Sequence, residues 1–512
     1  MRVAGATAPD APAAPAQDAA PTPADTARPF DFSAGVSASE TYASNSSGAS
    51  LGGKDDYIST IGFNAAIHDR TRTVALDATY SFGAAFYAKG TQSTQITNNL
   101  TAIGSIEAIE DHLLVTARAF AAPVIVSNVS SLTAGYRSVP NGYRNSYGYA
   151  VSPDLRFRLD QFAVSDTVAM YGSTYFTNPA GPAPVIIPGL AGPEDSTTRA
   201  VNQTIASGEN FGRLGWTLDG SFSELKRKQG LLSEKGGTGQ FRFAFSHEFS
   251  LLTTDGYEAI SSTVPLTKNV SGLIAMGGFS WTWGEDFLLT AQAGRKFNNA
   301  SYVGSLRYNL TPTSSIVGSA NDQVTTPEGQ LLDSLTNLVA TPSGALTTSD
   351  SLLGNGNAAS LPAFSPQPPT NFGFDQSISR YQTINISFLE DFERNHVALN
   401  VFGGRRTLLA GVPSGPPVTE SWGGQLTYSR NISPRTLGTL SGGYTQDQEF
   451  GGQGRTFRID AQVTYAVSRE MQLFMRTDYL DRHSSAVLTA VAPAFTGSLT
   501  DYEIAIGVSR AL

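Results

Sequence analysis

The chain has 512 residues, of which 15% are charged and 10% aromatic, and it contains 51 glycines and no cysteine. Soluble domains carry roughly 25% charged residues, so this composition disfavours an ordinary cytosolic enzyme. Without cysteine the chain has no thiolate metal site, thiol nucleophile or disulfide. The net charge of -9 disfavours a nucleic-acid partner. No run approaches the roughly 20 apolar residues that a membrane-spanning helix needs.

Residues 1–29 are rich in alanine and proline and have no apolar core of the kind that defines a secretory signal. This segment is predicted to be a disordered periplasmic tail, and an export signal is expected to have been removed or to lie upstream. A tether for a partner protein is the alternative interpretation. Residues 30–512 are predicted to form one transmembrane domain.

The first predicted strand covers Phe30 to Tyr42. Two further strands, which begin near Tyr57 and Arg72, are predicted to be joined by the tight turn His-Asp-Arg-Thr. The second of them alternates apolar residues with small and polar residues, which is typical of a strand with two different faces.

The rest of the chain is predicted to alternate short turns with longer loops. Short turns are expected at 110–111, 160–161, 208–213, 247, 284–285, 311–312, 393–395, 431–434 and 468–470. Longer loops are expected near residue 90 and at 128–143, 179–193, 325–371, 411–417, 451–454 and 484–497. Pro153 offers an alternative position for the turn at 160–161, because Ser-Pro favours turns.

The last twelve residues show the pattern most clearly, because Tyr502, Ile504, Ile506 and Val508 alternate with polar or small residues until Arg510 interrupts the apolar row. One face of such a strand suits hydrocarbon and the other suits water. Strands can cross a bilayer only in a closed sheet, since no backbone group can stay unpaired there. The sequence therefore predicts an all-β, antiparallel, up-and-down outer-membrane β-barrel. It is expected to have about 22 strands, or 18–20 as the alternative, with short periplasmic turns, longer external loops and both termini in the periplasm.

The inward faces of the predicted strands carry polar and aromatic residues that would line the lumen and contact a translocated solute. These lumen candidates are Arg156, Arg158, Asp160, Arg242, Phe402, Arg458, Asp460, Phe474, Arg476 and Asp478. The charged members are interpreted as pairs that neutralise one another, or alternatively as a polar track for a sugar chain. The two phenylalanines could stack on sugar rings.

No residue pattern predicts catalysis. The histidines His68, His112, His247 and His396 fall beside four different predicted turns, and none has metal-site spacing. The chain is therefore predicted to have no catalytic, cofactor or metal site and not to be an enzyme. The longest loop, 325–371, or alternatively a partner protein, is expected to occlude the barrel, because a wide empty lumen would leak.

Several phrases resemble one family of outer-membrane barrels. The stretch SWTWGEDFLLTAQAGRKFNNASYVGSLRYNLTPTSSIVGSANDQVTTP is similar to the central block of barrels associated with exopolysaccharide and PEP-CTERM loci. DDYISTIGFNAAIHDRTRTVALDATYSFGAAFY resembles their first hairpin, and SPRTLGTLSGGYTQDQEF with YLDRHSS resembles their final hairpins.

The resemblance implies an outer-membrane exit for an exopolysaccharide that works with a periplasmic polysaccharide export protein. The expected partners are outer-membrane lipid and lipopolysaccharide, that export protein and the translocated polysaccharide chain. A general or substrate-specific porin for small solutes is the alternative. A TonB-type receptor is disfavoured, because the predicted tail is too short for a plug domain.

Overall fold

The structure is a computed structural model, and it describes residues 30–46, 53–125, 143–177, 195–228, 230–263, 269–326, 338–340, 346–348, 378–410, 417–449, 452–485 and 497–512. Among these residues the only helix is a 3-10 turn at Glu209–Phe211. In the described part of the chain no helix has the length and apolar character needed to cross a membrane.

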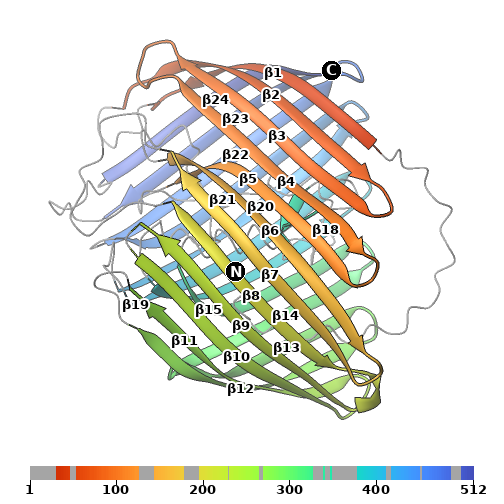
Figure 1. Cartoon of the computed structure of the whole chain (residues 1–512). Coiled ribbons are helices and arrows are strands. Elements are labelled where there is room, and N and C mark those ends of the chain that lie inside the picture. The colour runs from red at the N-terminus through yellow and green to blue at the C-terminus, as the bar shows by residue number, and fades with distance from the viewer. Residues whose placement is uncertain are drawn as a thin grey trace.

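Twenty-two antiparallel strands form one closed sheet (Figure 1). Each strand pairs with the next, β15 pairs with β18, and the last strand, β24 (Gly497–Ala511), closes against the first, β1 (Phe30–Ala43). The remaining strands of the sheet are β2 (Asp56–Arg70), β3 (Val74–Tyr87), β4 (Gln95–Ile109), β5 (Leu113–Ile125), β6 (Tyr143–Leu159), β7 (Ala163–Phe176), β8 (Ser196–Ser207), β9 (Leu214–Arg227), β10 (Gly230–Ala244), β11 (Phe249–Ser262), β12 (Val270–Trp283), β13 (Phe287–Lys296), β14 (Asn299–Thr311), β15 (Ser314–Thr325), β18 (Ile378–Asp391), β19 (Asn395–Ala410), β20 (Val418–Ser433), β21 (Thr436–Glu449), β22 (Gly452–Ala466) and β23 (Met471–Ser484). The predicted antiparallel barrel of 22 strands is confirmed, and the count of 18–20 is wrong.

The two faces of the sheet differ in chemistry. Phe241 and Phe243 of β10 are 44% and 45% exposed, whereas Arg242 between them points to the other face. In β24, Ile506 is 61% exposed on the same outer face as Tyr502. Because residues that pair directly across strands share a face, this assignment extends around the whole sheet. The outer face is apolar and suits hydrocarbon, and the inner face is polar.

Both ends of the barrel sheet lie at the end that carries the short turns. Phe30 pairs with Asp69, beside the turn at 71–73, and the amide of Ala511 donates to the carbonyl of Glu470 in the turn between β22 and β23. The predicted short turns are confirmed to within a few residues. Pro153 lies inside β6, so the turn follows it at 160–162.

The connections at the opposite end are less uniform than predicted. The predicted loops at 128–143, 179–193, 411–417 and 484–497 lie largely outside the described residues. However, the loop predicted at 451–454 is wrong, because β22 begins at Gly452, only two residues after the end of β21 at Glu449. The strands β9 and β10, and the strands β13 and β14, are likewise separated by only two residues.

The turn between β13 and β14 makes the barrel wall low at one place. Phe297 and Asn298 both have positive φ angles, 50° and 62°, as a two-residue hairpin turn of the I′ kind requires. Phe297 is only 8% exposed and packs in a cluster with Ile260, Val324 and Ile378. Residues from β11, β15 and β18 therefore close over the short hairpin.

The long connection between β15 and β18 contains a small hairpin of its own, β16 (Leu338–Ala340) and β17 (Leu346–Thr348). Its backbone lies close to β4 and β3, which are halfway around the closed sheet from β15. In Figure 1 the hairpin lies within the outline of the barrel. The rest of the predicted occluding loop, 325–371, lies outside the described residues apart from its first two residues.

Candidate functional site

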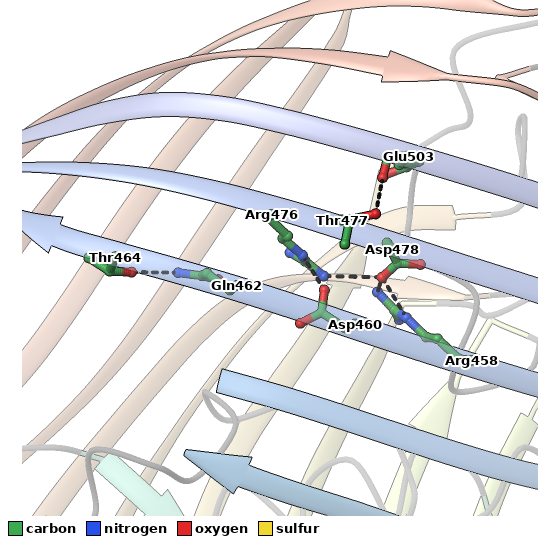
Figure 2. Close-up of polar contacts among 8 residues, drawn as sticks. All are labelled: Arg458, Asp460, Gln462, Thr464, Arg476, Thr477, Asp478 and Glu503. Carbon is green, nitrogen blue, oxygen red and sulfur yellow. Dashed lines mark hydrogen bonds and ion pairs between the residues drawn. The ribbon is translucent and has the colours of Figure 1, made fainter. Parts of the chain in front are cut away.

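A cluster of charged residues lies on the lumen face of β22 and β23 (Figure 2). Arg458 and Asp460 project inward from β22 because they alternate with the exposed Phe457 and Ile459. Asp460 stands directly opposite Asp478 of β23, so two carboxylates face each other across neighbouring strands. Like charges in this position repel, and the pair needs cations beside it.

Two arginines supply those cations. Arg458 Nε donates to Asp478 Oδ2 at 2.8 Å, and Arg476 Nη2 lies 3.4 Å from the same oxygen. Arg476 also pairs with Asp460. The Asp478 side chain is 11% exposed and that of Arg476 is 42% exposed, so the carboxylate is shielded while one guanidinium still meets the lumen. These four charges are therefore ion-paired with one another, and their role along the path of a solute stays a prediction.

Arg156 forms a second ion-paired group on the lumen face. Its guanidinium lies 3.1 Å from Asp154 Oδ2 and 3.5 Å from Asp166 Oδ2, so it bridges β6 and β7. Neither aspartate was predicted. Asp154 follows the proline that offered an alternative turn, and Asp166 becomes a neighbour only through the register of β7.

Arg158, Asp160 and Arg242 come together around one cavity of about 740 Å³. The cavity lies near the short-turn end, where the turns at 160–162 and 208–213 contribute to its lining. Arg242 Nε donates to Ser250 Oγ at 3.1 Å. Asp160 lies in the short turn that was predicted at 160–161, with a φ of 52°. The sequence places Arg158 and Arg242 far apart, and only the barrel brings them together.

Phe402 and Phe474 face the lumen as predicted, but both rings lie against the wall. A Cβ atom built on Gly423 would lie 2.8 Å from Phe402 Cζ, and one built on Gly507 would lie 2.6 Å from Phe474 Cε1. Each ring therefore occupies the space above a glycine of the neighbouring strand. Rings in this position fill the wall and offer only part of their faces to a sugar.

A buried lumen pair was not predicted at all. Lys296 Nζ of β13 lies 2.9 Å from Glu258 Oε2 of β11, and both side chains are at most 5% exposed. Glu234 of β10 is also buried on the lumen face. These residues are far apart in the sequence, and each looks like an ordinary polar residue of an alternating strand. No local signal could have identified them.

Two of the histidines form hydrogen bonds with carboxylates across their hairpins. His68 contacts Asp77, and His396 contacts Asp391. Within the residues that the structure describes, no group of three or more histidine, aspartate or glutamate side chains is arranged to hold a metal ion.

No protein-family model matches the chain, and no curated protein sequence matches it either. Among solved structures, the siderophore receptor PirA from Pseudomonas aeruginosa is 10% identical, with 94% of this chain and 80% of that chain covered and a TM-score of 0.43. The FrpB iron transporter from Neisseria meningitidis (F3-3 variant) is 12% identical, with 94% and 82% covered and a TM-score of 0.49. The siderophore receptor PiuA from Acinetobacter baumannii is 9% identical, with 94% and 82% covered and a TM-score of 0.46.

At these identities and TM-scores the likeness carries no argument about what this chain transports. None of the matches supports the resemblance to barrels of exopolysaccharide loci, which stays a prediction. What the strand register and the two faces show is the architecture of an outer-membrane β-barrel, closed by 22 strands.

Proposed function

We propose that the chain is a passive, hydrated outer-membrane conduit that releases an exopolysaccharide delivered by a periplasmic export protein. The observation that carries the proposal is the chemistry of the lumen wall. Several of its charges are ion-paired, as in the cluster of Arg458, Arg476, Asp460 and Asp478, and the rings of Phe402 and Phe474 lie against the wall. Such a surface can exchange hydrogen bonds with many hydroxyl groups without holding one pose, which suits a sliding sugar chain.

The position of the β16–β17 hairpin also supports this proposal. A barrel of this size has a wide lumen that would leak if it were empty. The hairpin lies close to β4 and β3, nearly halfway around the closed sheet from β15 and β18, the strands that precede and follow it in the chain. In the proposed orientation the short turns and both chain ends face the periplasm, where the export protein would dock.

The deciding experiment is an in-frame deletion of the gene, with exopolysaccharide measured both outside the cell and in the periplasm. The proposal expects polymer to be lost outside and retained or arrested inside, and the wild-type gene should restore secretion. A complementing variant with Arg458→Gln and Arg476→Gln tests whether the lumen wall itself matters. Normal secretion in the deletion strain would contradict the export function and leave the barrel fold unaffected.

A porin for small solutes is the second candidate, and the cavity lined by Arg158 and Arg242 favours it. A volume of about 740 Å³ is within the usual range for a small-molecule site. In this case the purified barrel should form channels in planar bilayers whose current is reduced by a small solute, and Arg242→Gln should weaken that block. A channel insensitive to small solutes would speak against the porin.

A further inference from the structure

Three cations lie on the outer face of three consecutive strands. Arg199 of β8 and Lys226 of β9 belong to the face that also carries Val201 and Phe222, which pair directly and are 44% and 41% exposed. Lys235 of β10 pairs with Phe222 and shares this face. The three cations are therefore on the side of the sheet that meets lipid, and all three are exposed.

These cations gather at the end of the barrel opposite the short turns. Arg199 is near the start of β8, Lys226 is beside the end of β9, and Lys235 is in the first half of β10. Neighbouring strands are about 4.8 Å apart, so the three strands spread the cations over about 10 Å across the sheet, and Lys235 lies about 13 Å below Lys226 along the strands because it pairs with Phe222. We name these three residues the basic patch.

The basic patch has more positive than negative charge. The one acidic residue within it is Glu224, which stands directly opposite Arg199. Over the described residues, no ion pair involves Arg199, Lys226 or Lys235. Two other outward cations do have partners, since Arg405 lies 3.6 Å from Glu420 and Arg510 lies 3.7 Å from Glu470.

Apolar side chains continue from the basic patch towards the middle of the barrel. Phe222 and Val201 lie next to it, and Tyr171, which is 45% exposed, pairs with Arg199. The surface thus offers positive charge beside hydrocarbon and aromatic contact, with Lys226 nearest the rim and Lys235 level with Phe222. An anionic amphiphile whose headgroup sits at the rim matches both parts.

We propose that the basic patch binds the phosphorylated headgroup of lipopolysaccharide, with acyl chains against Phe222, Val201 and Tyr171. Lipopolysaccharide fits better than a phospholipid, because a headgroup with two phosphates can engage cations on three strands at once. This proposal depends on the outer-membrane location and on the long-loop end facing outward. It does not depend on which solute crosses the lumen.

The test is an equilibrium titration of the purified, delipidated barrel with bisphosphorylated lipid A in detergent. An interfacial lysine or arginine near an anionic surface strengthens binding about fivefold, so the variant R199Q/K226Q/K235Q should lose about 100-fold in affinity. Glu224→Gln should bind more tightly than the wild type, because it removes the one carboxylate. Arg469→Gln is the matched control, since Arg469 is an exposed cation in a short turn at the other end.

The mobility difference between boiled and unboiled protein in gel electrophoresis shows whether each variant has folded. If the triple variant does not fold, the single variant Lys226→Gln, at the strand end, takes its place. Unchanged affinity in a folded variant would overturn the proposal. Equal binding of dephosphorylated lipid A, or equally tight binding of phosphatidylglycerol, would overturn it as well. If the barrel did not bind lipid A while polysaccharide secretion was normal, the lipopolysaccharide proposal would be overturned and the proposed export function would still stand.

Discussion

Asp478 has the most charged contacts in the lumen cluster of Figure 2, because its carboxylate meets Arg458 and Arg476 and stands opposite Asp460. Its partner on the other side, in the register of β24, is Glu503. Removing this one carboxylate changes the balance between two arginines and the remaining acids, so the ion selectivity of the lumen depends strongly on it.

We therefore expect Asp478→Asn to shift the zero-current potential of the channel towards anion preference in bilayers with a salt gradient. Asp460→Asn should produce a smaller shift, since Asp460 pairs only with Arg476. Equal shifts in the two variants would show that the pairing seen here does not determine the local charge.

Gly507 is a lumen-facing position where a single added methyl group should lower stability. A Cβ atom there would lie 2.7 Å from the carbonyl oxygen of Ala38 as well as 2.6 Å from Phe474 Cε1. We expect Gly507→Ala to lower the free energy of unfolding by about 1–3 kcal/mol, the usual cost of overpacking. Urea titration in lipid vesicles measures it.

Gly277→Ala is the control for that experiment, because no heavy atom lies within 4 Å of a Cβ atom built at Gly277. It should leave the unfolding free energy unchanged or raise it slightly, since glycine weakens a strand. If both variants lost the same unfolding free energy, the loss at Gly507 would come from reduced backbone flexibility and not from the contact with Phe474.

At the residue scale, the sequence predicted the face to which each side chain points better than it predicted the residues that the side chain contacts. Alternation alone placed Arg458, Arg476 and Phe474 on the lumen face, because side-chain direction in a strand follows from a period of two. It could not show that Phe474 covers a glycine or that Lys296 meets Glu258. Those contacts depend on the register between strands, which a single sequence does not contain.

The short hairpin of β13 and β14 is the element that departs most from an even barrel. The register of β14 with β15 begins only at Gly304 and Ala320, below the tops of both strands. Arg380 of β18 bridges this place, since it pairs with Asp322 and donates to the carbonyl of Ala300. The side chains of Arg380 and Asp322 are 5% and 0% exposed.

Breaking this buried pair should therefore be costly. We expect Arg380→Met to lower the free energy of unfolding by about 3–5 kcal/mol, because it leaves the buried Asp322 carboxylate without its cation. Lys89→Met, which breaks the half-exposed pair with Asp55, should cost less than about 1 kcal/mol. If the two variants unfolded at the same urea concentration, the Arg380 bridge would not hold β14, β15 and β18 together.

The strands and most short turns were predictable, because alternation and the residues Gly, Asn, Asp and Pro signal them. The turn at Phe297 and Asn298 was not, since such turns usually carry Asn-Gly or Asp-Gly. Here the burial of Phe297 in the cluster over the hairpin holds a residue with a large side chain at positive φ. Packing between strands that are distant in the sequence therefore stabilises this turn without the usual Asn-Gly or Asp-Gly pair.

At the scale of the whole molecule, the β16–β17 hairpin bears on how open the barrel is. The hairpin itself lies close to β3 and β4, on the far side of the closed sheet from β15. We expect deletion of residues 338–348 to increase single-channel conductance in planar bilayers. Deletion of 411–416, which shortens another connection at the same end, should leave the conductance nearly unchanged. If both variants had the same conductance as the wild type, the hairpin would not narrow the path through the barrel.

The pairing of β1 with β24 also determines when the molecule can fold. Ser44 Oγ donates to Asp501, a residue 457 positions later, and the carbonyl of Ala34 accepts from the amide of Leu512. No chain that stops before β24 can form these contacts, so ring closure must wait until β24 has been synthesised. Contacts of such sequence separation also form slowly. Until the ring closes, β1 keeps an unpaired edge, and unpaired strand edges readily pair with other chains.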